Sequence, residues 1–160
     1  MNERMLAVKL WITTFCTAIS AALGRNGIMA VLWVFVMLLD YLSGSAAACR
    51  TGRWSSAAAR QGLWHKDGMI LVVAVAAISD YMISVVWPTL PMGVRFPWPG
   101  VIFPLVLAWY IITELGSILE NAIQMGANVP DWLAKMLKTG LTAVDRAGTA
   151  AADTEKEDVK

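Results

Sequence analysis

Long apolar stretches separated by short polar ones dominate the sequence. Four of them, at approximately 5–23, 27–48, 67–87 and 100–122, have the length of about 20 residues that a helix needs to cross roughly 30 Å of hydrocarbon. "GRNG" at 24–27 can only join antiparallel neighbours, and the proline-rich "WPTLPMGVRFPWPG" at 87–100 indicates a rigid, non-helical connector. The pattern predicts an all-α integral membrane protein, a bundle of four transmembrane helices, or three if the first segment does not span, within a membrane domain at 1–128.

The first apolar stretch allows other interpretations. "MNERMLAVKLWITTFCTAISAALG" has a basic start, an apolar middle and a small-residue end, as a cleavable signal peptide has. Both Met1 and Met5 could begin translation, and the longer product would carry Arg4 as an additional charge. A cleaved signal peptide and a second start at Met5 both stay open, as does the question whether the first helix spans the membrane.

Beyond the fourth stretch the pattern changes to that of an amphipathic helix. Asn128 is a possible cap and Pro130 suits the first turn. One face of the following segment is apolar and consists of Leu133, Met136, Leu137, Leu141 and Val144. We expect a cytoplasmic amphipathic helix at 129–146, on the membrane surface or against a neighbour, and a disordered charged tail at 147–160.

Composition and charge placement support this membrane interpretation. Hydrophobic residues make up 58% and charged residues 16% of the chain, whereas soluble domains have about 45–50% and about 25%. Lys and Arg concentrate near the amino end, in 49–66 and in the carboxyl-terminal segment, while the other two connectors hold only Arg25 and Arg95. Because basic residues stay on the cytoplasmic side, the expected protein is multi-pass with both termini cytoplasmic. If the first segment does not span, the amino end lies outside.

The basic loop at 49–66 contains "RTGRWSSAAARQGLWHK", in which Ser55 or Ser56 can cap a short helix. We expect this helix along the inner headgroup surface, where anionic lipid explains its cations better than nucleic acid does. The candidate membrane-surface residues are Arg50, Arg53, Arg60 and Lys66.

Four carboxylates fall inside the expected spans: Asp40, Asp80, Glu114 and Glu120. A charge at the centre of a span costs about 2.5–3.5 kcal/mol, so each acid is expected to face away from lipid. Helical spacing groups Glu114 with Ser117 and Asn121, with Glu120 close beside that stripe. Asp40 is followed at similar spacing by Ser43 and Gly44.

These polar groups support two interpretations. They can bond the helices of one bundle together, or they can line water after several subunits associate. An enzyme is not expected, because the sequence has no nucleophile–His–acid arrangement and no Gly-rich phosphate loop. Cys16, Cys49 and His65 do not form a metal-ligand set, and neither a metal nor a cofactor is expected.

The order of these motifs resembles the phage-type holins of the toxin-secretion and phage-lysis family over about 40–137. The matching positions are Asp40, Ser43 and Gly44; Ser56, Gly62 and Lys66; Asp80; then Glu114, Ser117, Glu120 and Asn121, with Gly126 and Pro130. The sequence departs from the family pattern at Arg60 and Gln61, which stand near a usual glycine, and in its longer, proline-rich connector.

The resemblance implies a small protein of the bacterial cytoplasmic membrane, encoded by a phage or prophage. It would associate with copies of itself in the lipid and open a large non-selective pore that releases a muralytic enzyme or a toxin at a set time. The expected pore or oligomer seam consists of Asp40, Ser43, Gly44, Asp80, Glu114, Ser117, Glu120 and Asn121. The alternatives are a small ion- or proton-coupled transporter or channel subunit, and a membrane scaffold that anchors a partner through the 129–145 helix.

Overall fold

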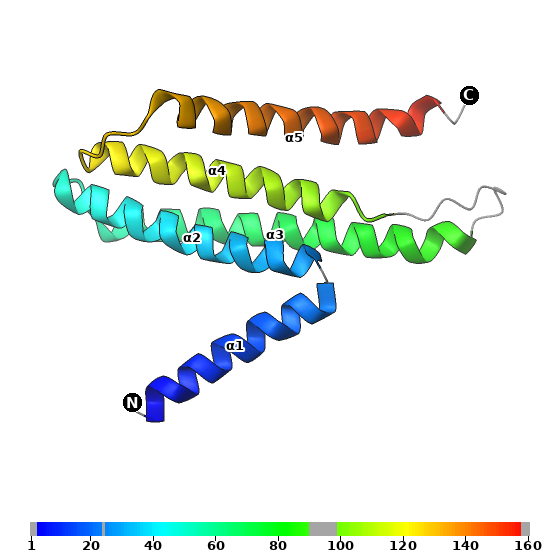
Figure 1. Cartoon of the computed structure of the whole chain (residues 1–160), viewed down its shortest axis with the longest axis horizontal. Coiled ribbons are helices and arrows are strands. Elements are labelled where there is room, and N and C mark those ends of the chain that lie inside the picture. Colours follow the sequence, from blue (N-terminus) through cyan, green and yellow to red (C-terminus); the bar gives the residue numbers. More distant parts are fainter. Residues whose placement is uncertain (1–2, 24, 90–98, 158–160) are drawn as a thin grey trace.

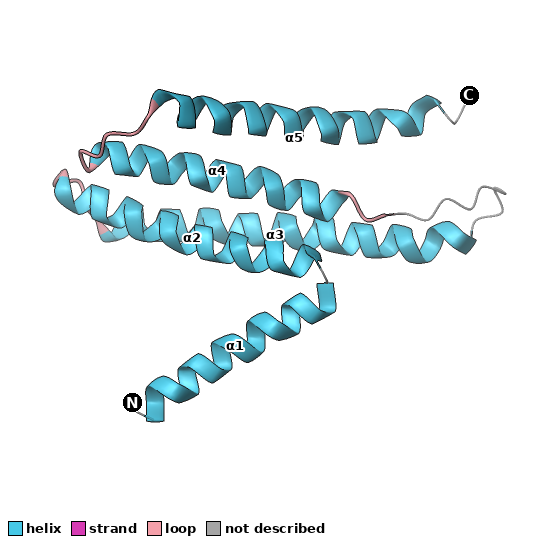
Figure 2. Cartoon of the chain, viewed as in Figure 1, coloured by secondary structure: helices cyan, strands magenta, loops and turns pink. Residues whose placement is uncertain are grey.

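The computed structural model describes residues 3–23, 25–89 and 99–157, and all regular structure in these ranges is helical. In chain order the elements are α1 (Glu3–Leu23), α2 (Arg25–Arg50), α3 (Ser56–Val86), the 3-10 turn η1 (Trp87–Thr89), α4 (Ile102–Gln124) and α5 (Asp131–Glu157). Figure 2 shows these helices in one colour, with short loops from α2 to α3 and from α4 to α5. The predicted all-α fold is confirmed.

Three helices in the described part of the chain are long and apolar enough to cross a membrane: Asn26–Arg50, Ser56–Thr89 and Ile102–Gln124. In the described part of α1 there is also a shorter apolar piece, Met5–Phe15. The structure thus supports three spans by length and composition, and a fourth span in α1 stays a prediction.

α4 is the central helix of the fold, because it packs against α2, α3 and α5. In Figure 1, α5 lies along α4 on the side away from α2 and α3, and α1 diverges from the other helices. Among the described residues, α1 packs only against α2, and α5 only against α4. The bundle proper thus consists of α2, α3 and α4, with one helix attached on either side of it.

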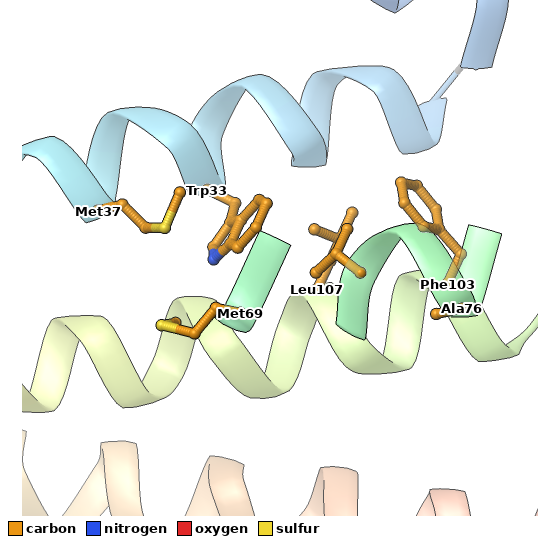
Figure 3. Packing of buried hydrophobic residues seen from close by; sticks show 7 residues of the cluster. Trp33, Met37, Met69, Ala76, Phe103 and Leu107 are labelled. Carbon is orange, nitrogen blue, oxygen red and sulfur yellow. The ribbon is translucent and has the colours of Figure 1, made fainter. Parts of the chain in front are cut away.

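The apolar core lies where α2, α3 and α4 meet. Figure 3 shows its side chains converging between the three helices, with Leu107 of α4 fully buried at the centre. The cluster comprises Trp33, Met37, Met69, Val73, Ala76, Phe103 and Leu107. Its members recur every three, four or seven residues along each helix, so each helix contributes one apolar face. This packing fixes how the polar faces of the same helices are aligned.

The ends of α2 and α4 have the same geometry. In each, a glycine with positive φ follows the cap, Gly52 at 67° and Gly126 at 89°. The amide of the next residue then bonds back into the last turn, from Arg53 to Ala48 O at 3.0 Å and from Ala127 to Ala122 O at 3.0 Å. This Schellman arrangement satisfies the last carbonyls and stops the helix. The turns place the polar ends of α2, α3 and α4 close to one another.

Several element boundaries differ from those predicted. α3 begins at Ser56, capped by Ser55 Oγ, which accepts from Ala58 N at 3.1 Å, so the expected short surface helix and the third span are one helix of 31 residues. At 1.5 Å per residue this helix is about 46 Å long, which exceeds the hydrocarbon thickness. Its first turns therefore extend beyond the lipid tails.

The carboxyl-terminal segment also differs, since α5 continues to Glu157 rather than ending near 146. Four alanines after residue 146 have high helix propensity and extend the helix through most of the tail that was expected to be disordered. Residues 158–160 lie outside the described residues, as do residues 90–98 of the proline-rich connector. At the start of that connector, residues 87–89 form the turn η1 instead of an irregular segment.

Candidate functional site

Five polar side chains from α2, α3 and α4 form one connected group, which we call the inner polar cluster: Asp40, Ser43, Lys66, Glu114 and Asn121. The Lys66 ammonium lies at its centre. Lys66 Nζ donates to Asp40 Oδ2 at 2.9 Å and to Glu114 Oε2 at 2.5 Å. One cation therefore joins a carboxylate of α2 to a carboxylate of α4.

Asn121 closes the cluster on the side of α2. Its Nδ2 donates to Asp40 Oδ1 at 3.2 Å and to Ser43 Oγ at 3.0 Å, and Ser43 Oγ donates to the Asp40 carbonyl at 3.0 Å. Gly44 provides the space for this contact, since a Cβ there would lie 3.4 Å from Asn121 Nδ2. The Asp40–Ser43–Gly44 group and the Glu114–Asn121 face predicted from spacing thus contact each other directly.

The inner polar cluster is mostly shielded from the surroundings. The side chains of Asp40, Lys66 and Glu114 are 17%, 12% and 5% exposed. With all three groups ionised the sum is two negative charges and one positive charge, so the single ammonium is shared by both carboxylates. Charges removed from water are tolerated only when paired and hydrogen-bonded in this way. The cluster can clamp three helices together, and it offers little surface to a neighbouring copy.

Lys66 differs most from its predicted place. The sequence indicated a membrane-surface loop residue, whereas Lys66 lies inside α3 and its ammonium points into the bundle. The reason is its spacing from the buried positions Met69, Val73, Ala76 and Asp80 of the same helix, which puts it on the inward face. This spacing is visible in the sequence, but a lysine beside a long apolar stretch is also typical of the end of a span.

The other basic residues of the 49–66 segment are exposed: Arg50, Arg53 and Arg60. Arg50 lies over the end of α4, because a Cβ built on Gly126 would be 3.3 Å from one of its guanidinium nitrogens. Between the end of α2 and the start of α3 is a pocket of about 220 Å³ whose walls include Gly44, Trp54, Gly62 and Lys66. The cationic end of the bundle thus leads directly to the inner polar cluster.

Four polar side chains on another face of α4 are exposed, and we call them the outer polar stripe: Thr113, Ser117, Glu120 and Gln124. Their spacing of four, three and four residues places them on one side of the helix. Spacing alone grouped Ser117 with Glu114 and Asn121, but the structure separates it from them. Thr113 and Gln124 were not predicted, because an uncharged threonine is common within a span and Gln124 follows the predicted end of the span at residue 122.

Asp80 belongs to neither group and caps a helix that is not its own. From α3, its carboxylate accepts from Ile102 N at 3.1 Å and from Phe103 N at 2.7 Å. These are first-turn amides of α4, which have no partner inside that helix. An acid at a helix amino terminus also interacts favourably with the helix dipole. Asp80 therefore fixes the start of α4 against α3.

The described residues contain no group of three or more His, Cys, Asp or Glu side chains that could hold a metal ion. The polar arrangements found there are a buried ion cluster, a helix cap and an exposed stripe.

Comparison with known proteins identifies relatives over most of the chain. The model of the bacteriophage holin family matches residues 17–140. An uncharacterised protein of Halalkalibacterium halodurans is 31% identical over 116 residues, covering 72% of this chain and 80% of that protein. An uncharacterised protein of Listeria innocua is 27% identical, covering 82% and 85%, and an uncharacterised 14.9 kDa protein of Clostridium perfringens is 25% identical, covering 82% and 90%. No solved structure matches the chain.

Proposed function

Because the chain belongs to the bacteriophage holin family, which is not a family of enzymes, and is a membrane protein, we propose that it forms a large non-selective pore. Copies associate in the bacterial cytoplasmic membrane, and the pore releases a muralytic enzyme or a toxin in timed lysis or secretion. The cargo is the macromolecule that crosses the pore, and no cofactor takes part.

The observation that carries this proposal is the outer polar stripe. Ser117 and Glu120 lie exposed on α4, which is long and apolar enough to cross the membrane. Lipid gives polar groups no hydrogen bonds, so such side chains at hydrocarbon depth need another polar surface or water. Copies that meet along this stripe give one another a polar surface in small assemblies. In a larger ring, the same stripe faces the water inside the pore.

The remaining candidate residues support the pore from within each copy. The inner polar cluster holds α2, α3 and α4 in one register through Lys66 and Asn121. Asp80 fixes the start of α4. A rigid copy presents its outer polar stripe at a constant angle, which a closed ring of identical subunits requires.

Charge placement supports one orientation of the three spans. The turn between α2 and α3 carries Arg50 and Arg53, with Arg60 in the next helix. Basic flanks are retained inside, so we place this turn and the end of α4 on the cytoplasmic side. In this orientation the amino end is cytoplasmic if α1 also crosses the membrane, and it lies outside if α1 does not cross.

The test is induction of the gene in a bacterium that also expresses a cytoplasmic reporter enzyme. A pore predicts dye entry, loss of viability and release of the intact enzyme within one short interval. The Glu120→Ala variant should shift the time of release, whereas Asp67→Ala, which removes an exposed acid of α3, should not. Dye or ion entry without enzyme release would favour the small transporter or channel subunit instead.

A further inference from the structure

α5 lies along the membrane-spanning part of α4 rather than beyond its end (Figure 1). Trp109 Nε1 donates to Asp145 Oδ1 at 2.9 Å. A Cβ built on Gly140 would lie 3.4 Å from Ile112 Cδ1. Ile112 is close to the middle of α4, which covers Ile102–Gln124. If α4 crosses the bilayer, the contacts of α5 are at mid-bilayer depth.

One side of α5 is polar along almost its whole length. We call it the α5 polar stripe, and it comprises Asp131, Lys135, Lys138, Thr142, Asp145, Thr149 and Asp153. All seven residues are exposed, and they recur every three or four residues, so they share one face. The side that packs on α4 is formed by partly buried residues: Leu133, Leu137, Gly140, Leu141 and Val144. α5 therefore has an apolar side already covered and a charged side that is not.

The α5 polar stripe borders the outer polar stripe of α4. Trp109 precedes Thr113 by four residues, so it lies on the same side of α4 as the outer polar stripe. Asp145 is itself part of the α5 polar stripe. The hydrogen bond between Trp109 and Asp145 therefore joins the edges of the two stripes. Together they form one polar surface that extends over both helices.

We propose that α5 remains against α4 in the assembled pore and lines its water-filled lumen with the α5 polar stripe. This inference rests on the proposed pore function and assigns its wall. At the depth of Ile112, charged side chains such as Lys138 and Asp145 cannot face lipid, and the face that carries them is continuous with the outer polar stripe. Water enclosed by several copies is the occupant that satisfies both stripes at once.

A first experiment asks whether α5 must leave α4 for the pore to open. Ile112→Cys and Gly140→Cys are combined in a chain in which Cys16→Ala and Cys49→Ala remove the native thiols. The protein is reconstituted into vesicles that contain fluorescent dextran, and a short bismaleimide then links the cysteines at positions 112 and 140. The matched control pairs Ile112→Cys with Trp132→Cys, an exposed position two turns away on α5. We expect linkage only in the first pair, with dextran release within about twofold of the unlinked sample.

Failure of linkage in membranes, or a drop in release of tenfold or more after linkage, would overturn the assignment of α5. The second result would identify α5 as a cover that must be removed. Absence of release from the unlinked chain and from the control pair would instead refute the proposed pore itself. The two failures are therefore distinguishable in one series of samples.

A second experiment asks whether α5 meets water at depth. An environment-sensitive fluorophore is placed at Thr142→Cys, in the α5 polar stripe, or at the adjacent Ala143→Cys, which is exposed on another side. We expect aqueous iodide to quench the label at 142. Nitroxides at the bilayer centre should quench the label at 143 more than nitroxides on headgroups do. Stronger headgroup quenching at 143, or no iodide quenching at 142, would place α5 elsewhere and refute the inference.

Discussion

On α4, residues of the inner polar cluster and of the outer polar stripe are next to each other in sequence. The first are buried or partly buried in the bundle, and the second are exposed. Glu114 is buried against Lys66, whereas Thr113 is exposed; Asn121 bonds to α2, whereas Glu120 is exposed. One step of about 100° around the helix separates each pair. The residue type alone therefore does not determine what a polar residue in a span does. The face of the helix on which it lies determines whether it packs inside the bundle or is exposed on the outside.

The comparison predicts different consequences of substitution in the two regions. Changes in the inner polar cluster should reduce the stability of each copy. Changes in the outer polar stripe should leave the copy stable and alter its association. Stability measured in mixed micelles and oligomer size measured in membranes separate these effects.

Lys66→Met should have the largest effect. It leaves the carboxylates of Asp40 and Glu114 mostly buried without their common cation, and breaking such a buried ion cluster by removing one partner costs about 3–5 kcal/mol. Unfolding by a denaturing detergent should occur at a markedly lower detergent fraction. Lys138→Met on the exposed side of α5 is the control. An equal response of the two variants would show that the inner polar cluster does not clamp the bundle.

Asp80→Ala comes next. Two amides of α4 lose their acceptor, and hydrogen bonds to a charged group contribute about 1.5–3 kcal/mol each, so we expect a loss of about 3 kcal/mol, the low end of their sum. Asp80→Asn keeps one acceptor oxygen and should lose less. Hydrogen exchange of the Ile102 and Phe103 amides reports the change directly. Unaltered protection of both amides in Asp80→Ala would contradict the capping role.

Asn121→Ala should have a smaller effect, because hydrogen bonds between membrane helices contribute only about 0.6 kcal/mol each. Two such bonds are lost, from Asn121 Nδ2 to Asp40 and to Ser43. We expect a loss of about 1 kcal/mol in detergent unfolding. Gln124→Ala, at the end of the outer polar stripe, is the matched amide control and should leave stability unchanged.

Glu120→Gln should have the smallest effect on stability, within about 0.5 kcal/mol as for most exposed substitutions. Its effect should be on assembly, because it removes the only charge in the outer polar stripe. Cross-linking in membranes followed by gel analysis should show a changed distribution of oligomers. A large loss of stability with unchanged oligomers would reverse the distinction between the two regions.

Much of the fold followed from the sequence because hydrophobic length and helical spacing are local properties. The three helices that are long and apolar enough to cross a membrane correspond to long apolar stretches of the sequence, and spacing placed Glu114 with Asn121 and Asp40 with Ser43. Spacing along one helix could not predict which polar side chains of different helices contact one another. The contact of Asn121 with Asp40 joins residues 81 positions apart and depends on the tertiary packing.

Lys66 and Ser117 differ from their predicted places for two separate reasons. A positive charge often marks the end of a span, but the long side chain of Lys66 brings its ammonium from α3 to the carboxylates of Asp40 and Glu114. Ser117 was assigned by approximate spacing, which cannot resolve faces about 100° apart. For α5 the sequence left open the membrane surface or a neighbour, since an amphipathic face does not specify its partner, and the structure packs α5 on α4.

The cap that Asp80 provides has a consequence for how this chain tolerates change. The register of α4 against α3 is fixed by two hydrogen bonds at its first turn, and not by the length of the chain that connects the two helices. Insertions and deletions between residues 90 and 98 are therefore expected to leave α3 and α4 in the same register. The same segment is the natural place to insert an epitope that reports on sidedness without disturbing assembly.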